Sequence, residues 1–139
     1  MLNLIAINII TDKGQRSTTM RIPELIQLLE AKVLTECDLP ESDIQYAFAS
    51  DMMSDVLAYA DRHMLLITSL TNPQTIRTAE MLDLDCVLYV RGKIPSAAAL
   101  AMAEDRNITV LTTKCTMFNT CGILYDTGIR GGNLNDNPH

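Results

Sequence analysis

The sequence has few basic residues, and this scarcity limits the partners it could bind. Lys and Arg total 11 against 17 Asp and Glu, so the 139-residue chain carries a formal net charge of −6 at pH 7. No basic run or Arg-rich helix is present. Because proteins neutralise the phosphates of nucleic acids with Lys and Arg, the composition argues against nucleic acid as a partner.

Signals for membranes, metals and disulfides are also missing. The apolar stretch Leu2–Ile10 is shorter than the roughly 20 residues that span a bilayer, and no signal-peptide cleavage site follows it. No C-x-x-C pair and no Cys/His cluster with zinc spacing occurs. We therefore expect no membrane span, metal or cofactor, and reduced thiols in a cytoplasmic protein. The four cysteines are Cys37, Cys86, Cys115 and Cys121.

What the sequence does contain is an apolar run of five residues that occurs three times. The runs start at Met64, Cys86 and Ile108, each 22 residues after the one before, and a helix-like stretch separates each pair. This spacing predicts a β-α-β-α-β unit with a parallel sheet. The hydrophobic content of 47% is sufficient for a core. We expect an α/β fold of three layers, α/β/α, with a mostly parallel central sheet built from repeated β-α units.

The remaining elements follow from turn and capping residues. Ser54 and Ser96 are expected to cap two helices at their N-termini. The predicted helices are Pro23–Ala31, Val56–Ala60, Thr75–Leu84, a segment from Ser96 to Arg106, and Cys115–Leu124. The two further predicted strands are Val33-Leu34 and Ile44–Ala49, the latter with Ile44, Tyr46 and Phe48 on its larger face. In the third of these helices we expect Ile76, Ala79 and Leu82 to face inward, and in the fourth Ala97, Leu100, Ala101 and Ala103.

Three ranges divide the chain. Residues 20–125 form the α/β domain, and residues 126–139, which are rich in Gly and Asn, form a flexible tail. Residues 1–19 have two interpretations. The alternation of Ile5, Ile7 and Ile9 suits a strand that adds to the sheet edge or pairs with a second subunit. Alternatively, the natural domain begins at Met20 and residues 1–19 are an upstream extension.

The candidate ligand site lies where the parallel strands end. Loops that follow the carboxyl ends of parallel strands gather at one edge of the sheet, where α/β proteins bind their ligands. Arg91, Gly92 and Lys93 follow the second run, and Ser96 starts the next helix. Two cations and a helix N-terminus favour a phosphate or carboxylate. The residues expected to complete the site through neutral hydrogen bonds are Asn72, Thr112, Thr113 and Thr116.

Several short motifs resemble the DRTGG domain family, the fold of the amino-terminal domain of HPr kinase/phosphorylase. The resemblance rests on Ile22–Leu34, the stretch from Phe48 to Leu57, and Leu65–Thr68 before a polar turn. It continues with Val90–Lys93 before a Pro-Ser helix start, and Val110–Thr113 with Thr116 and Phe118 beyond. At the positions of the family signature, this chain has Leu70-Thr71-Asn72-Pro73-Gln74 and Val90-Arg91-Gly92.

The resemblance implies a layered α/β/α fold and a stand-alone regulatory domain that senses an anionic metabolite or nucleotide. It also implies a homo-oligomer, in the simplest case a dimer, and no catalysis. Kinase activity would need a P-loop, and Gly92-Lys93 lacks the earlier Gly of that motif because Val87 stands in its place.

Two other functional classes remain open from the residues alone. The chain could be an interaction or oligomerisation module without a small ligand, with Met52 and Met53 as adaptable surface residues. It could also be a small enzyme, with Asp51, Asp55 and His63 as an acid–base set. No G-x-S-x-G, H-E-x-x-H or Gly-rich phosphate loop supports the enzyme.

Overall fold

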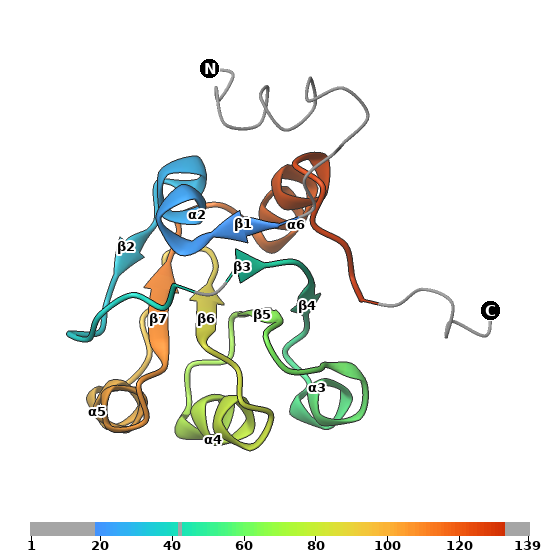
Figure 1. Cartoon of the computed structure of the whole chain (residues 1–139). Coiled ribbons are helices and arrows are strands. Elements are labelled where there is room, and N and C mark those ends of the chain that lie inside the picture. Colours follow the sequence, from blue (N-terminus) through green and yellow to red (C-terminus); the bar gives the residue numbers. More distant parts are fainter. Residues whose placement is uncertain (1–18, 42, 133–139) are drawn as a thin grey trace.

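The computed structural model describes residues 19–41 and 43–132, which form three layers (Figure 1). A five-stranded sheet in the order β2-β7-β6-β5-β4 forms the middle layer. Its strands are β2 (Lys32–Val33), β4 (Ala47–Ala49), β5 (Leu65–Thr68), β6 (Cys86–Tyr89) and β7 (Thr109–Thr112). β2 runs antiparallel to β7, and the other strands are parallel. The predicted α/β fold with a mostly parallel sheet is confirmed.

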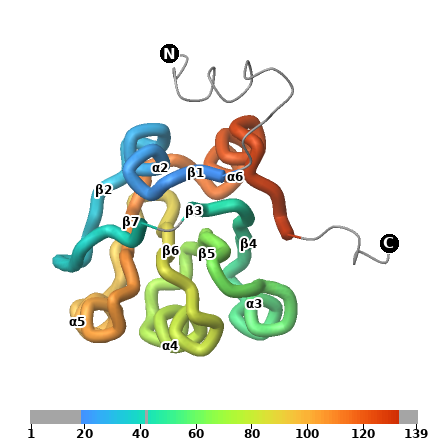
Figure 2. Tube along the Cα trace, viewed as in Figure 1, coloured from blue at the N-terminus to red at the C-terminus, as the bar shows by residue number. Residues whose placement is uncertain are grey.

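Helices cover both faces of the sheet. One face carries α3 (Met53–Tyr59), α4 (Pro73–Met81) and α5 (Ala97–Asp105), and the other carries α2 (Ile22–Leu29) and α6 (Met117–Asp126). Figure 2 shows that α2, near the start of the described chain, and α6, near its end, lie on the same face. A second sheet of two antiparallel strands, β1 (Met20–Arg21) and β3 (Asp43–Ile44), lies beside α2.

The three recurring apolar runs became the central strands because both of their faces are buried. Along β5, Leu65 and Ile67 join the core under α2 and α6, whereas Leu66 joins the core under α3, α4 and α5. In β6, Leu88 and Val87 divide in the same way. Strands buried on both sides need continuous apolar sequence, which is why these runs were detectable.

The helix predictions were confirmed in position but corrected in detail. Ser54 is not an N-cap: α3 begins three residues before the expected Val56, at Met53, because Met53 and Val56 are both buried, on one helical face. Met53 is therefore a core residue, while Met52 is 59% exposed. In α5, the buried residues are Ala99 and Ala103, while Ala97 and Ala101 are exposed and Leu100 is half-buried.

The predicted strand Ile44–Ala49 is divided between the two sheets. Ile44 pairs with Met20 in the small sheet, and Ala47 pairs with Leu65 in the large one. Ile44 packs in the core under α2 and α6, whereas Tyr46 and Phe48 pack against the opposite core. These three residues therefore do not share a face, because the chain changes partner strand between Ile44 and Ala47.

The chain stays folded against the sheet beyond residue 126, where a flexible tail was expected to begin. Ile129 is only 4% exposed, and Arg130 forms an isolated parallel bridge with Tyr46. Residues 1–18, with their expected extra strand, and residues 133–139 of the expected tail lie outside the described residues. Among the described helices, none is both long and apolar enough to cross a membrane.

Candidate functional site

The topology places a crevice between the carboxyl ends of β6 and β7. After β6 the chain leads to α5 on one face of the sheet, and after β7 it leads to α6 on the opposite face (Figure 1). Adjacent parallel strands whose following connections diverge in this way leave an opening, and ligands of α/β proteins bind at such points. Loops 91–95 and 113–119, which contain the predicted site residues Arg91–Lys93, Thr113 and Thr116, border this opening.

Backbone hydrogen bonds hold the two loops together. Arg91 and Gly92 both have left-handed backbones, with φ of 56° and 66°. The Arg91 N–H donates to the Cys115 carbonyl at 2.8 Å, and the Gly92 N–H donates to the Thr113 carbonyl at 2.7 Å. The Lys93 N–H donates to the Val90 carbonyl. The N–H groups of the Arg91-Gly92-Lys93 turn therefore bond to the protein itself.

Beside these loops lies a groove of about 600 Å³. It opens between the end of α2 and β2 on one side and the loops that follow β6 and β7 on the other. Four aliphatic residues contribute to its wall, and its charged residues are Lys32, Lys114 and Glu30. The lining residues are Leu28, Leu29, Glu30, Lys32, Gly92, Ile94, Thr112, Thr113, Lys114, Cys115 and Ile123.

Five of the predicted site residues lie in or beside this groove. Gly92, Thr112 and Thr113 line it. The Thr112 hydroxyl donates to the Lys93 carbonyl at 2.7 Å, and the Thr113 hydroxyl donates to the Leu29 carbonyl at 2.8 Å. Both hydroxyls therefore shape the groove wall. Arg91 and Lys93 flank Gly92 with exposed side chains.

The other three predicted residues cap helices. The side-chain oxygens of Asn72, Ser96 and Thr116 accept hydrogen bonds from backbone N–H groups at the starts of α4, α5 and α6, at 3.1, 3.1 and 3.2 Å. These bonds satisfy helix N–H groups that lack partners within the helix. None of the three residues lines the groove.

Two of the groove's cations were missed by the sequence reasoning. Lys114 is the second residue after the third apolar run, so its position after a parallel strand was an available signal. Lys32 had no such signal, because it reaches the groove only through the antiparallel pairing of β2 with β7, in which Lys32 lies opposite Thr112.

Asp51 is a further polar residue at the carboxyl edge, after β4. Its carboxylate accepts hydrogen bonds from the Ser69 N–H at 2.6 Å, the Ser69 hydroxyl at 2.7 Å and the Thr68 hydroxyl at 2.8 Å. Partial burial acts to raise the pKa of Asp51, but these hydrogen bonds and the nearby Arg91 charge outweigh it and lower the pKa. Asp51 thus anchors the loop after β5.

The acid–base set considered from the sequence is not assembled. Asp51 follows β4 at the carboxyl edge, whereas His63 precedes β5 at the amino edge of the parallel sheet, 3.5 Å from Asp85. Among the described residues, no group of three or more His, Cys, Asp or Glu is placed to hold a metal ion.

Comparison with known proteins supports the fold assignment. The chain is similar to a crystal structure of the CBS and DRTGG domains of the regulatory region of Clostridium perfringens pyrophosphatase, complexed with the activator diadenosine tetraphosphate. The TM-score is 0.64 over 91% of this chain and 57% of that one, at 14% sequence identity. The likeness concerns the fold, which is consistent with that of a DRTGG domain. The chain spans little more than half the length of the one that it matches. No family model and no curated protein matches it.

Proposed function

We propose that this chain is a non-catalytic regulatory domain that binds an anionic small molecule, a nucleotide or another anionic metabolite, in the groove beside β6 and β7. The observation that carries the proposal is the charge of the groove. Lys32 and Lys114 line it, and Arg91 and Lys93 flank its Gly92, in a chain whose net charge is −6. Glu30 is the sole acid among its lining residues.

The groove also suits a ligand with an apolar part. Its volume falls within the range of about 300–1,000 Å³ that is usual for small-molecule sites. Leu28, Ile94 and Ile123 supply aliphatic surface, and Ile94 is 60% exposed. We expect the ligand's apolar body to contact these side chains while its anionic group pairs with the lysines.

The similar structure supports a regulatory role. That structure is a regulatory region of a pyrophosphatase, and it contains a nucleotide activator. By analogy of fold, we infer that ligand binding here controls an attached or associated protein rather than a reaction in this domain.

A thermal-shift screen of the full chain tests the proposal. The panel comprises adenine nucleotides, other nucleoside phosphates, acyl phosphates and small carboxylates. A ligand at about 100 times its dissociation constant stabilises the fold by roughly 2.7 kcal/mol, which raises the melting temperature by several degrees. We expect such a shift in the wild type and its loss in the Lys32→Ala, Lys114→Ala double variant.

A matched control distinguishes the loss of the groove lysines from a general loss of positive charge on the protein. The Arg62→Ala, Arg77→Ala variant removes two positive charges away from the groove lining and should keep the full shift. The Arg91→Ala, Lys93→Ala variant measures how much the two flanking cations contribute to the ligand-induced thermal shift. A ligand that shifts wild type and the Lys32/Lys114 variant equally would contradict the groove as its site.

We further propose that the domain forms a homodimer through the outer face of α6. Phe118 is 86% exposed. Gly122 lies four residues after it and therefore on the same side of the helix. A Cβ atom added to Gly122 would meet nothing within 4 Å, so a second helix has room to approach closely there.

A further inference from the structure

The outer edge of β4 carries unused backbone hydrogen-bonding positions. The Tyr46 carbonyl accepts from the Leu65 N–H at 2.9 Å, and the Ser50 N–H donates to the Ile67 carbonyl at 3.0 Å. Alternate residues of a parallel strand bond to the same neighbour, so Ala47 and Ala49 face away from β5. The Ala47 N–H confirms this direction because it donates to the Arg130 carbonyl at 2.9 Å.

Beyond that contact no described strand pairs with β4, although Gly131 still lies beside Ala47 in the lining of the adjoining pocket. Within residues 19–41 and 43–132, β4 is the last strand of the sheet, and the pairing with Arg130 is a single bridge. The carbonyl of Ala47 and both backbone groups of Ala49 point outward. Folded proteins usually protect such edges with charged residues, Pro or bulges. The strand Ala47–Ala49 contains neither a charged residue nor Pro.

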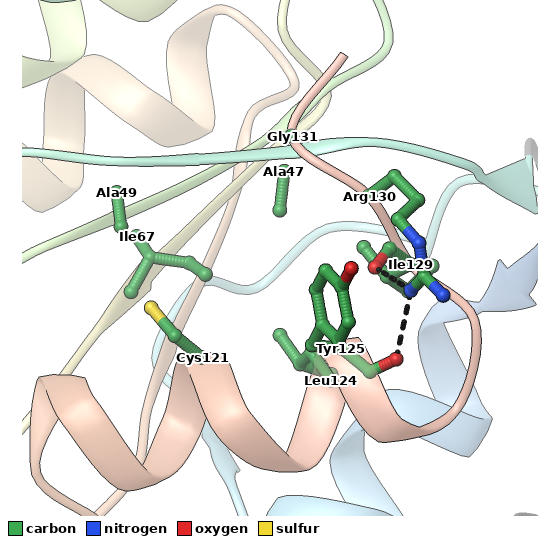
Figure 3. A pocket seen from close by; sticks show the side chains of 9 residues that line it. All are labelled: Ala47, Ala49, Ile67, Cys121, Leu124, Tyr125, Ile129, Arg130 and Gly131. Carbon is green, nitrogen blue, oxygen red and sulfur yellow. Dashed lines mark hydrogen bonds between the residues drawn. The ribbon is translucent and has the colours of Figure 1, made fainter. Parts of the chain in front are cut away.

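An apolar pocket of about 100 Å³ lies directly beside this edge, between β4 and α6 (Figure 3). Ala47 and Ala49 leave it open because their side chains are small, and Cys121 and Tyr125 enter it from α6. The Arg130 guanidinium is held by the Tyr125 and Ile129 carbonyls, both at 2.9 Å, and stacks 3.8 Å from the centre of the Tyr125 ring. The pocket therefore suits an aliphatic side chain.

We propose that the amino-terminal segment Leu2–Ile10 of the same chain adds to β4 as a sixth strand and places one of its alternating isoleucines in this pocket. The described chain starts next to the edge: Met20 pairs with Ile44, three residues before Ala47. Residues 11–18 are eight residues that extend up to about 28 Å, which is sufficient to connect the two strands. The strand supplies backbone partners for the Ala47 carbonyl and for the N–H and carbonyl of Ala49, which have none among the described residues; the Ala47 N–H is already bonded to Arg130.

Residue-resolved hydrogen exchange in the full chain tests this docking. The Ala49 N–H faces the open edge, whereas the Phe48 N–H faces β5 and serves as an internal control. We expect the triple variant Ile5→Ser, Ile7→Ser, Ile9→Ser to exchange the Ala49 amide at least about tenfold faster than wild type, with Phe48 unchanged. The double variant Asn3→Ser, Asn8→Ser should behave as wild type. Equal exchange at Ala49 in wild type and the triple variant would overturn the proposal.

Cross-linking to Cys121 identifies which copy supplies the segment. Ile5→Cys, Ile7→Cys and Ile9→Cys variants are oxidised and analysed without reductant, and Cys121→Ser in each background is the control. An intramolecular disulfide that disappears with Cys121→Ser supports docking within one chain. A covalent dimer that depends on Cys121 would overturn it and show that a second copy occupies the edge.

Discussion

Asp51 lies where three strands of the sheet end. It follows β4, its carboxylate accepts three hydrogen bonds from Thr68 and Ser69 at the end of β5, and the charge of Arg91, after β6, helps to lower its pKa. Although Asp51 is exposed, its carboxylate fixes the position of neighbouring loops. The sequence indicated only a turn here, because nothing in the chain order reveals that Ser69 lies within hydrogen-bonding distance of Asp51.

We predict that Asp51→Asn destabilises the domain by about 1 kcal/mol at pH 7, a modest value because the group is exposed. The folded-state pKa is lowered, so the ionised carboxylate stabilises the fold above the ordinary pKa of 3.8. This contribution is lost as the pH falls through the lower folded-state pKa. Urea unfolding of wild type and variant should therefore give a difference at pH 7 that shrinks as the pH falls below 3.8.

A double-variant cycle provides the control for this prediction. If Asp51 acts through Ser69, then Ser69→Ala should destabilise the wild type but cost less in the Asp51→Asn background. Fully additive effects, or a difference between wild type and Asp51→Asn that does not change with pH, would contradict the role assigned to the carboxylate.

At the scale of elements, the helices that follow β5, β6 and β7 all begin with a side-chain cap, at Asn72, Ser96 and Thr116. The sequence predicted Ser96 both as a cap and as a ligand. Its hydroxyl accepts a hydrogen bond from the Ala99 N–H. Capping and ligand binding make different predictions for substitutions.

We predict that Ser96→Ala and Thr116→Ala each lower the free energy of unfolding by about 1 kcal/mol, the usual cost of removing an N-cap. Ser96→Asp should keep most of the stability, because Asp also caps helices. Chemical denaturation measures both effects. Neither alanine variant should change the affinity for an anion found in the thermal-shift screen. A large loss of affinity in Ser96→Ala would instead indicate that Ser96 contacts the ligand.

The limits of prediction at this scale follow from what each pattern encodes. The runs at Met64, Cys86 and Ile108 were predicted because strands buried on both faces are apolar throughout. The alternation of larger and smaller side chains in Ile44–Ala49 would look the same whether the segment formed one strand or two short strands. Its division depends on Met20 and Leu65, the partners of the two halves, which are distant in sequence.

At the scale of the whole molecule, the sequence located the edge of the sheet where a site should lie but not the groove itself. Gly92, Thr112 and Thr113 were predicted from chain order after parallel strands, and they line the groove. Lys32 was not predicted, because an antiparallel edge strand brings its amino end to the carboxyl edge of its parallel neighbours. Long-range strand pairing of this kind has no signal in local sequence patterns.

The proposed dimer is also a property of the whole molecule, and Gly122 allows it to be tested without damage to the fold. Replacing Gly122 with Glu adds a charged side chain to the centre of the α6 face. Glu also has a higher helix propensity than Gly, by less than ~1 kcal/mol, so the change should not destabilise the monomer. We expect sedimentation velocity to show a dimer for wild type and a monomer for Gly122→Glu.

The matched control for the dimer is Tyr59→Glu, which introduces the same charge at another exposed position. Tyr59 is 72% exposed on α3, on the opposite face of the sheet from α6, and its substitution should leave the dimer intact. A wild type that stays monomeric at all concentrations would refute the dimer. A dimer that persists in Gly122→Glu but not in Tyr59→Glu would place the interface on α3. Since Gly122 and Tyr59 lie outside the groove, the ligand-induced thermal shift should be the same in both variants unless dimerisation and binding are coupled.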